Sequence, residues 1–271
     1  MRWIRLLAGL AVCGLATTAQ AGSLAEYYVG VDSRTQVSFG GQTHANPNFG
    51  RLTFLFQHGD HFHGIGAYSL TGDPTNPTIR DTNANNQIPE RYTGLPPIRL
   101  FLKDGSYVNK NTGDEYYNFE IRSIQSLAGF PPGSPEAILF NSSGGRWSGS
   151  LTGAQIALEL ISITPGLEIL DGMGNRILEN VGDQHMITPP GGDGNSFSFT
   201  PGYRVDGSAL MGSTYLVEYR LVDLSGIYGN SGRFQFVFQA VPEPSSAALL
   251  ALGVIPVMGR FLARHLRLRR S

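Results

Sequence analysis

The chain has 271 residues, with 20 basic and 21 acidic side chains. Seven of the basic residues and one of the acidic residues lie before residue 22 or after residue 241, which leaves 13 basic and 20 acidic residues in the body between them. A body this acidic excludes nucleic acid as an expected partner. Only 15% of the residues are charged and 35 are glycine, a composition that disfavours helix bundles and coiled coils.

Residues 1–21 are typical of a secretion signal. A short basic start precedes an apolar run, Leu6 to Ala16, that is too short to span a bilayer. Ala19 and Ala21 supply the small-x-small cleavage pattern, so we expect the mature chain to begin at the next residue. The only cysteine lies inside this segment. Its removal excludes disulfides and thiolate metal sites from the mature protein.

The body, residues 22–241, alternates its side chains with the period of two that is typical of β-strands. Leu52, Phe54 and Phe56 share one face of such a segment, while Thr53 and Gln57 lie on the other. Asp-Gly pairs at 104, 171, 193 and 206 indicate turns between strands. The segments predicted as strands are 27–31, 51–57, 62–70, 98–102, 117–124, 138–141, 157–163, 167–170, 196–200, 215–221 and 234–238.

This pattern predicts an all-β chain, organised as a single antiparallel β-sandwich or jelly-roll-like domain over residues 22–241. Residues 152–161 also fit a short helix, because an apolar run alone does not decide between helix and strand. Residues 72–92 are polar and rich in Asn, Pro and Thr, so we expect a long loop there.

Three histidines fall within six residues, His58, His61 and His63. Gly59 and Asp60 between them suit a two-residue hairpin turn. That turn places His58 opposite His61, and His63 lies two residues farther along on the same face. The sequence therefore predicts three imidazoles on one side of a hairpin, a donor set for Zn²⁺ or another divalent metal.

The ligand set of this predicted site is incomplete. Three histidines and one open position are the ligand set of catalytic zinc sites. Asp60, His44 and His185 are each candidates for a fourth ligand, and the sequence pattern does not choose among them. A slip of one residue in the hairpin register would remove the shared face.

A second, weaker metal motif lies in the predicted loop. Asp81, Asn83 and Asn85 have the alternate-oxygen spacing of a calcium-binding loop. The glycine at the sixth position and the glutamate at the twelfth are missing. A polar surface loop is therefore the alternative.

The C-terminal segment, residues 242–271, combines a Pro-x-Pro stop, an apolar run and a basic end. It resembles the PEP-CTERM sorting signals of Gram-negative bacteria. The residues that carry the resemblance are Pro242, Glu243 and Pro244, the run from Ala247 to Met258, and Arg260, Arg264, Arg267, Arg269 and Arg270.

This resemblance implies processing by an exosortase-type membrane protease, after transient anchoring in the inner membrane. It also implies delivery to the cell surface or extracellular matrix, often alongside exopolysaccharide. A plain C-terminal membrane anchor is the alternative, because residues 245–263 just span a bilayer if Arg260 snorkels.

Part of the body is similar to a Zur-regulated PEP-CTERM protein family. The similarity covers about the first third of the body, in 27–32, 47–56, 58–68 and 86–90. The regulator of that family senses zinc starvation, so the resemblance implies a role in zinc supply at the cell surface, in connection with a zinc-uptake system. It also implies His58, His61 and His63 as the zinc ligands.

Two classes of metalloenzyme are alternatives to this interpretation. A cupin-type enzyme matches His61 and His63, but the glutamate expected four or five residues later is missing from 65–70. A hydrolytic zinc enzyme needs a general base, and Asp60 is the carboxylate close to the histidines in sequence.

A carbohydrate-binding or exopolysaccharide-associated matrix protein without a metal is the main alternative. Trp147, Tyr116 and Tyr117 are its candidate stacking residues, although each also suits ordinary packing. We expect instead an exported, surface-sorted protein that captures or handles zinc rather than turning over a substrate.

Overall fold

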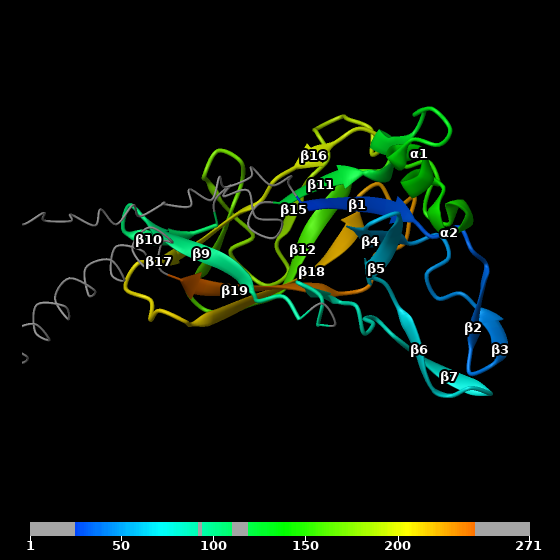
Figure 1. The fold of residues 1–271 in the computed structure, drawn as a ribbon, viewed down its shortest axis with the longest axis horizontal. Helices are drawn as coiled ribbons and strands as arrows, with labels where there is room; N and C mark the ends of the chain where they lie inside the picture. The colour runs from blue at the N-terminus through cyan, green and yellow to red at the C-terminus, as the bar shows by residue number, and fades with distance from the viewer. Residues whose placement is uncertain (1–24, 92–93, 110–118, 242–271) are drawn as a thin grey trace, which may run out of the picture.

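The computed structural model describes residues 25–91, 94–109 and 119–241 (Figure 1). The predicted signal segment, the sorting tail and the tyrosines at 116 and 117 lie outside these residues. The first strands are β1 (Ala25–Val31), β2 (Gln36–Phe39), β3 (Gln42–Ala45), β4 (Leu52–His58), β5 (His61–Gly66), β6 (Ser69–Asp73), β7 (Asn76–Arg80), β8 (Gln87–Ile88), β9 (Ile98–Lys103), β10 (Ser106–Val108) and β11 (Phe119–Ser123). The later strands are β12 (Ile156–Ile163), β13 (Leu167–Leu170), β14 (Arg176–Ile177), β15 (Gln184–Met186), β16 (Ser198–Phe199), β17 (Gly202–Asp206), β18 (Thr214–Asp223) and β19 (Phe234–Val241).

Two main sheets build the protein. A five-stranded sheet has the order β16-β11-β1-β4-β5. A ten-stranded, barrel-like sheet has the order β14-β13-β17-β10-β9-β19-β18-β12-β15, with β8 added beside β19. Two separate hairpins, β2–β3 and β6–β7, project from one end of the molecule (Figure 1).

The all-β prediction is confirmed, although the pairing is not antiparallel throughout. β1 pairs in parallel with β11, and β19 pairs in parallel with both β8 and β9. Each of these pairs joins strands that are far apart in the sequence, as parallel neighbours require, because a tight hairpin joins only antiparallel strands.

The five-stranded sheet is buried on both faces. Tyr27 and Phe54 belong to the main hydrophobic core together with Phe234 and Phe236 of β19, and Phe54 stacks on Phe234 with ring centroids 4.2 Å apart. The opposite face carries a second core cluster, which consists of Tyr28, Leu55, Phe62, Ile124, Leu127, Leu139 and Trp147. Alternation along β1 and β4 therefore supplies both cores at once.

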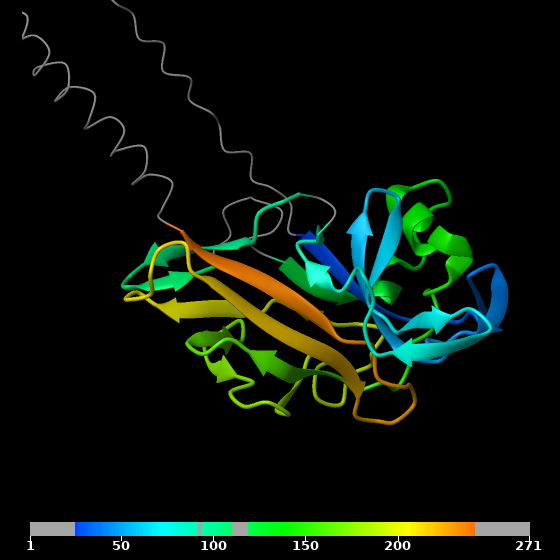
Figure 2. The same cartoon turned by 90° about the horizontal axis from the view of Figure 1, so that it is seen from below.

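Short helices cover that second face. They are η2 (Ile124–Leu127), α1 (Pro135–Phe140) and α2 (Ser142–Gly145), and Figure 2 shows them grouped beside the β4–β5 hairpin. The strand predicted at 138–141 is therefore wrong. Ser134 accepts a hydrogen bond from the Ala137 amide and Pro135 begins the helix, an N-cap signal that outweighs the short apolar run.

The structure also decides between helix and strand at 152–161 and corrects the loop predicted at 72–92. Residues 156–163 form β12, so the strand interpretation of 152–161 holds over that part. The long loop predicted at 72–92 instead contains most of the β6–β7 hairpin and β8. The helices of the described part of the chain are all too short to cross a membrane.

Candidate metal site

The β4–β5 hairpin has the predicted register. His58 lies opposite His61, and Phe56 lies opposite His63, across the turn formed by Gly59 and Asp60. Gly59 has a φ of +63°, a conformation that glycine adopts without steric cost. The three imidazoles therefore share the face of the sheet that continues from Phe56.

The three rings converge to form one histidine cluster. Nδ1 of His58 lies 3.3 Å from Nε2 of His63, and Nε2 of His61 lies 3.0 Å from the same atom. All three ligand atoms lie within 4.8 Å of one another. Zinc bound by nitrogen at about 2.0–2.1 Å in a tetrahedral site separates its ligands by about 3.4 Å. The two separations that involve His63 are close to that edge length, and all three are at most 4.8 Å.

The three facing ring nitrogens cannot all be paired by hydrogen bonds, and this favours a bound cation. Nε2 of His63 faces a nitrogen of His58 and a nitrogen of His61. A neutral imidazole nitrogen carries either one proton or one lone pair, so with neutral rings only one of the two contacts is a well-formed hydrogen bond. A divalent metal placed between the three lone pairs satisfies all of them at once.

Asp60 contributes to the cluster as a hydrogen-bond acceptor. Nδ1 of His61 donates to its Oδ1 at 3.1 Å, since an ionised carboxylate only accepts. This bond fixes the tautomer of His61 and leaves Nε2 free to bind a metal, an arrangement common around metal-bound histidines. The same bond lowers the pKa of Asp60, so the carboxylate is ionised at neutral pH.

His63 is the most buried member of the cluster. Partial burial lowers its pKa below the ordinary value, and the neighbouring charges of protonated His58 and His61 lower it further. His63 therefore loses its proton more readily than an exposed histidine. A neutral imidazole is the form that binds metal.

Neither of the other two candidate histidines joins the cluster. His44 lies in β3 opposite Val37, with its ring 6.3 Å from that of Phe39. His185 lies in β15 of the large sheet opposite Leu158, and burial lowers its pKa. Within the described residues, only His58, His61 and His63 form a group of three metal-ligating side chains. A metal held by these three side chains would therefore receive no fourth ligand from the other histidines of the described residues.

The residues of the predicted calcium loop have other contacts. Nδ2 of Asn83 donates to the carbonyl oxygens of Gly64, Ile65 and Ala67 and so covers the outer edge of β5. Asp81 pairs with Arg233. These contacts hold the loop against the histidine hairpin, and calcium binding stays a prediction.

The aromatic residue named for sugar stacking is buried. Trp147 is 7% exposed, belongs to the second core cluster and packs edge-on against Phe62. A buried indole offers no face to a sugar ring. Its role is to support β5 from behind.

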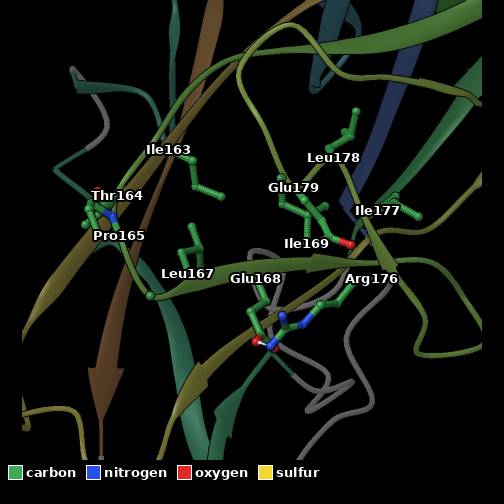
Figure 3. Close-up of a pocket in the computed structure, with 11 residues that line it drawn as sticks. Ile163, Thr164, Pro165, Leu167, Glu168, Ile169, Arg176, Ile177, Leu178 and Glu179 are labelled. Atoms are coloured by element: carbon green, nitrogen blue, oxygen red, sulfur yellow. Dashed lines mark ion pairs between the residues drawn. The ribbon is translucent and has the colours of Figure 1, made fainter.

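A cavity on the large sheet lies apart from the histidines. It measures about 200 Å³ and is lined by apolar and charged side chains of β13, β14 and their flanking segments (Figure 3). Its charged Glu168 is bridged to Arg176, as drawn in the figure, and to Arg204. No histidine lines this cavity, so it is not part of the metal site.

Comparison with known proteins adds no relative. No family model matches the chain, and no curated protein or solved structure is significantly similar to it. The hairpin and its histidines are therefore the feature of the molecule that points to a function.

Proposed function

We propose that this protein binds zinc through His58, His61 and His63 and captures or handles it outside the cytoplasm when zinc is scarce. The observation that carries the proposal is the convergence of three imidazole nitrogens within 4.8 Å on one face of a single hairpin. A site built on adjacent strands needs little rearrangement on binding, which favours affinity. Imidazole ligands also suit an oxidising compartment better than thiolates.

The proposed location follows from the ends of the sequence. The signal segment would export the protein, and the tail with its Pro242–Pro244 motif would be processed by an exosortase-type protease before delivery to the surface. A zinc-uptake system is the proposed recipient of the metal. The two facing sheets would serve as a β-sandwich-like scaffold for the site.

We infer binding rather than catalysis. The carboxylate at the site, Asp60, is bonded to His61 and has a lowered pKa. A general base for water activation needs a pKa near the working pH, which this carboxylate lacks. A zinc-bound water at the open position would instead leave room for a ligand from the recipient.

Competition with a chromophoric zinc chelator tests the binding step. The purified protein should take up one equivalent of zinc, and the triple variant His58→Ala, His61→Ala, His63→Ala should take up none. His185→Ala is the matched control, because it removes a half-buried histidine outside the cluster, and it should bind like the parent. Equal uptake by the parent and the triple variant would rule out this site.

A growth experiment tests the biological role. A strain that lacks the protein should grow poorly with a zinc chelator in the medium, and the parent gene should restore growth. The triple variant should fail to do so. Full rescue by that variant would show that zinc binding is not what the cell needs from this protein.

A further inference from the structure

A second cavity lies directly behind the histidine hairpin. It measures about 370 Å³, is open to solvent, and is bordered by the five-stranded sheet on one side and by η2 and α1 on the other. Tyr28 and Gln57 supply the sheet side, and their alternation places this cavity on the face opposite the imidazoles. Gly59 and Asp60 of the metal-site turn also line it, so the two sites share one turn.

The wall on the helical side carries several large apolar side chains. Leu127 and Leu139 line the cavity as members of the second core cluster. Phe130 and Ile138, at its rim, remain 44% and 48% exposed although they are large apolar side chains. The volume lies within the range of small-ligand sites, about 300–1,000 Å³.

Polar groups line the same cavity. Arg122 of β11 provides a positive charge, and its Nε lies 3.9 Å from Glu120. Asp60 and Glu136 provide two negative charges. The hydroxyl of Ser126 is buried and has no hydrogen-bond partner. A buried hydroxyl without a partner is costly, and a ligand with an amide group would satisfy it.

The strand order and register separate Arg122 from Asp60. Arg122 pairs with Tyr28, which pairs with Leu55, so Arg122 lies two strand spacings, roughly 10 Å, to the side of β4. Asp60 lies in the turn beyond the end of β4, so the two charges are also offset along the strands. An occupant that reaches both therefore carries an anionic group and a cationic group at opposite ends of an extended backbone. A short peptide with free termini has this form.

We propose that this cavity binds a short peptide of apolar residues with free termini. Its carboxylate lies at Arg122, its amino group lies between Asp60 and Glu136, and its side chains pack on Leu127 and Leu139. Ser126 and Gln57 form hydrogen bonds with its amide groups. Asp60 then contacts the peptide and His61 together, so the occupied cavity holds the carboxylate in the orientation that supports the metal site. Only this last link rests on the proposed function.

Calorimetric titration of the purified protein with the tripeptide Ala-Leu-Ala tests the proposal. We expect saturable binding, at least tenfold weakening when both termini are blocked by acetylation and amidation, and at least tenfold weakening in Arg122→Gln. Arg80→Gln is the matched control, because this exposed arginine lies on the β6–β7 hairpin. Equal binding of the free and blocked peptides, or no binding up to about 5 mM, would overturn the proposal.

The triple histidine variant separates this site from the metal site. It should bind the tripeptide as the zinc-free parent does, because the cavity is on the other face of the hairpin. Zinc added to the parent should strengthen peptide binding, by no more than the 10–100-fold that a partner of a metal-bound histidine contributes. Peptide binding that is lost in the triple variant would contradict the assigned location.

Discussion

Replacing Asp60 by asparagine tests how the turn supports the metal. The substitution keeps the shape of the side chain and removes the charge that accepts the 3.1 Å hydrogen bond from His61. His61 then loses the interaction that fixes its tautomer and orientation. Partners of metal-bound histidines contribute about 10–100-fold to metal affinity, so we expect the zinc affinity of Asp60→Asn to fall by this factor. The three nitrogen ligands themselves remain.

The position of Asp60 makes this effect separable from folding. Its side chain is 84% exposed, so the urea midpoint of the variant should match that of the parent. Asp73→Asn is the matched control, because Asp73 is an exposed carboxylate with a lowered pKa at the turn of another hairpin. Chelator competition on all three proteins gives the affinities. A change below about threefold in Asp60→Asn, or an equal loss in Asp73→Asn, would refute the orienting role.

The remaining predictions concern pH and the core. Burial lowers the pKa of His63 and of His185 in the folded, zinc-free protein. As the pH drops below about 6.5, these histidines therefore take up protons in the unfolded chain before they do so in the folded protein. The free energy of unfolding falls over this range, because protons bind the unfolded state more tightly. Urea titrations at several pH values should show a smaller fall in His185→Gln, and an unchanged slope would contradict this. Zinc affinity should fall over the same pH range, since protonated imidazole does not ligate, and an affinity that is constant between neutral pH and about pH 5 would argue against histidine ligands. Arg146→Gln should cost about 3–5 kcal/mol in urea unfolding, because the carboxylate of Asp32 is 1% exposed and loses its charged partner. A cost below about 1 kcal/mol would show that the ion pair is not needed.

The hairpin could be predicted because its information is local. A two-residue turn fixes the pairing of the residues on either side, and side chains in strands alternate with a period of two. These two rules place His58 opposite His61 and put His63 on the same face, as the structure shows. No contact with a distant part of the chain was needed for that inference.

The role of Asp60 could not be read from the sequence. A carboxylate between two histidines fits a ligand and a hydrogen-bond acceptor equally well. The side-chain direction at the turn decides between them, and it brings Oδ1 to the Nδ1 atom of His61. A hydrogen bond between a ligand histidine and its neighbour depends on the rotamers of both side chains, and residue spacing in the sequence does not specify rotamers.

The cavity behind the hairpin was missed for a different reason. Part of its helical wall is α1, residues 135–140, and the apolar run led to the prediction of a strand at 138–141. The cap at Ser134 and the following proline were the signal for a helix. The parallel pairing of β1 with β11, which brings Arg122 to the cavity, joins segments about 90 residues apart and has no local signature.

X-ray absorption at the zinc edge of the loaded protein tests the central claim most directly. A site of three histidines with one open position predicts three imidazole nitrogens at about 2.0–2.1 Å and one additional light ligand, in four-coordinate geometry. The triple histidine variant, treated in the same way, should retain no bound zinc. A spectrum with fewer than three imidazole ligands, or with six light ligands typical of a loosely held surface ion, would contradict the assignment.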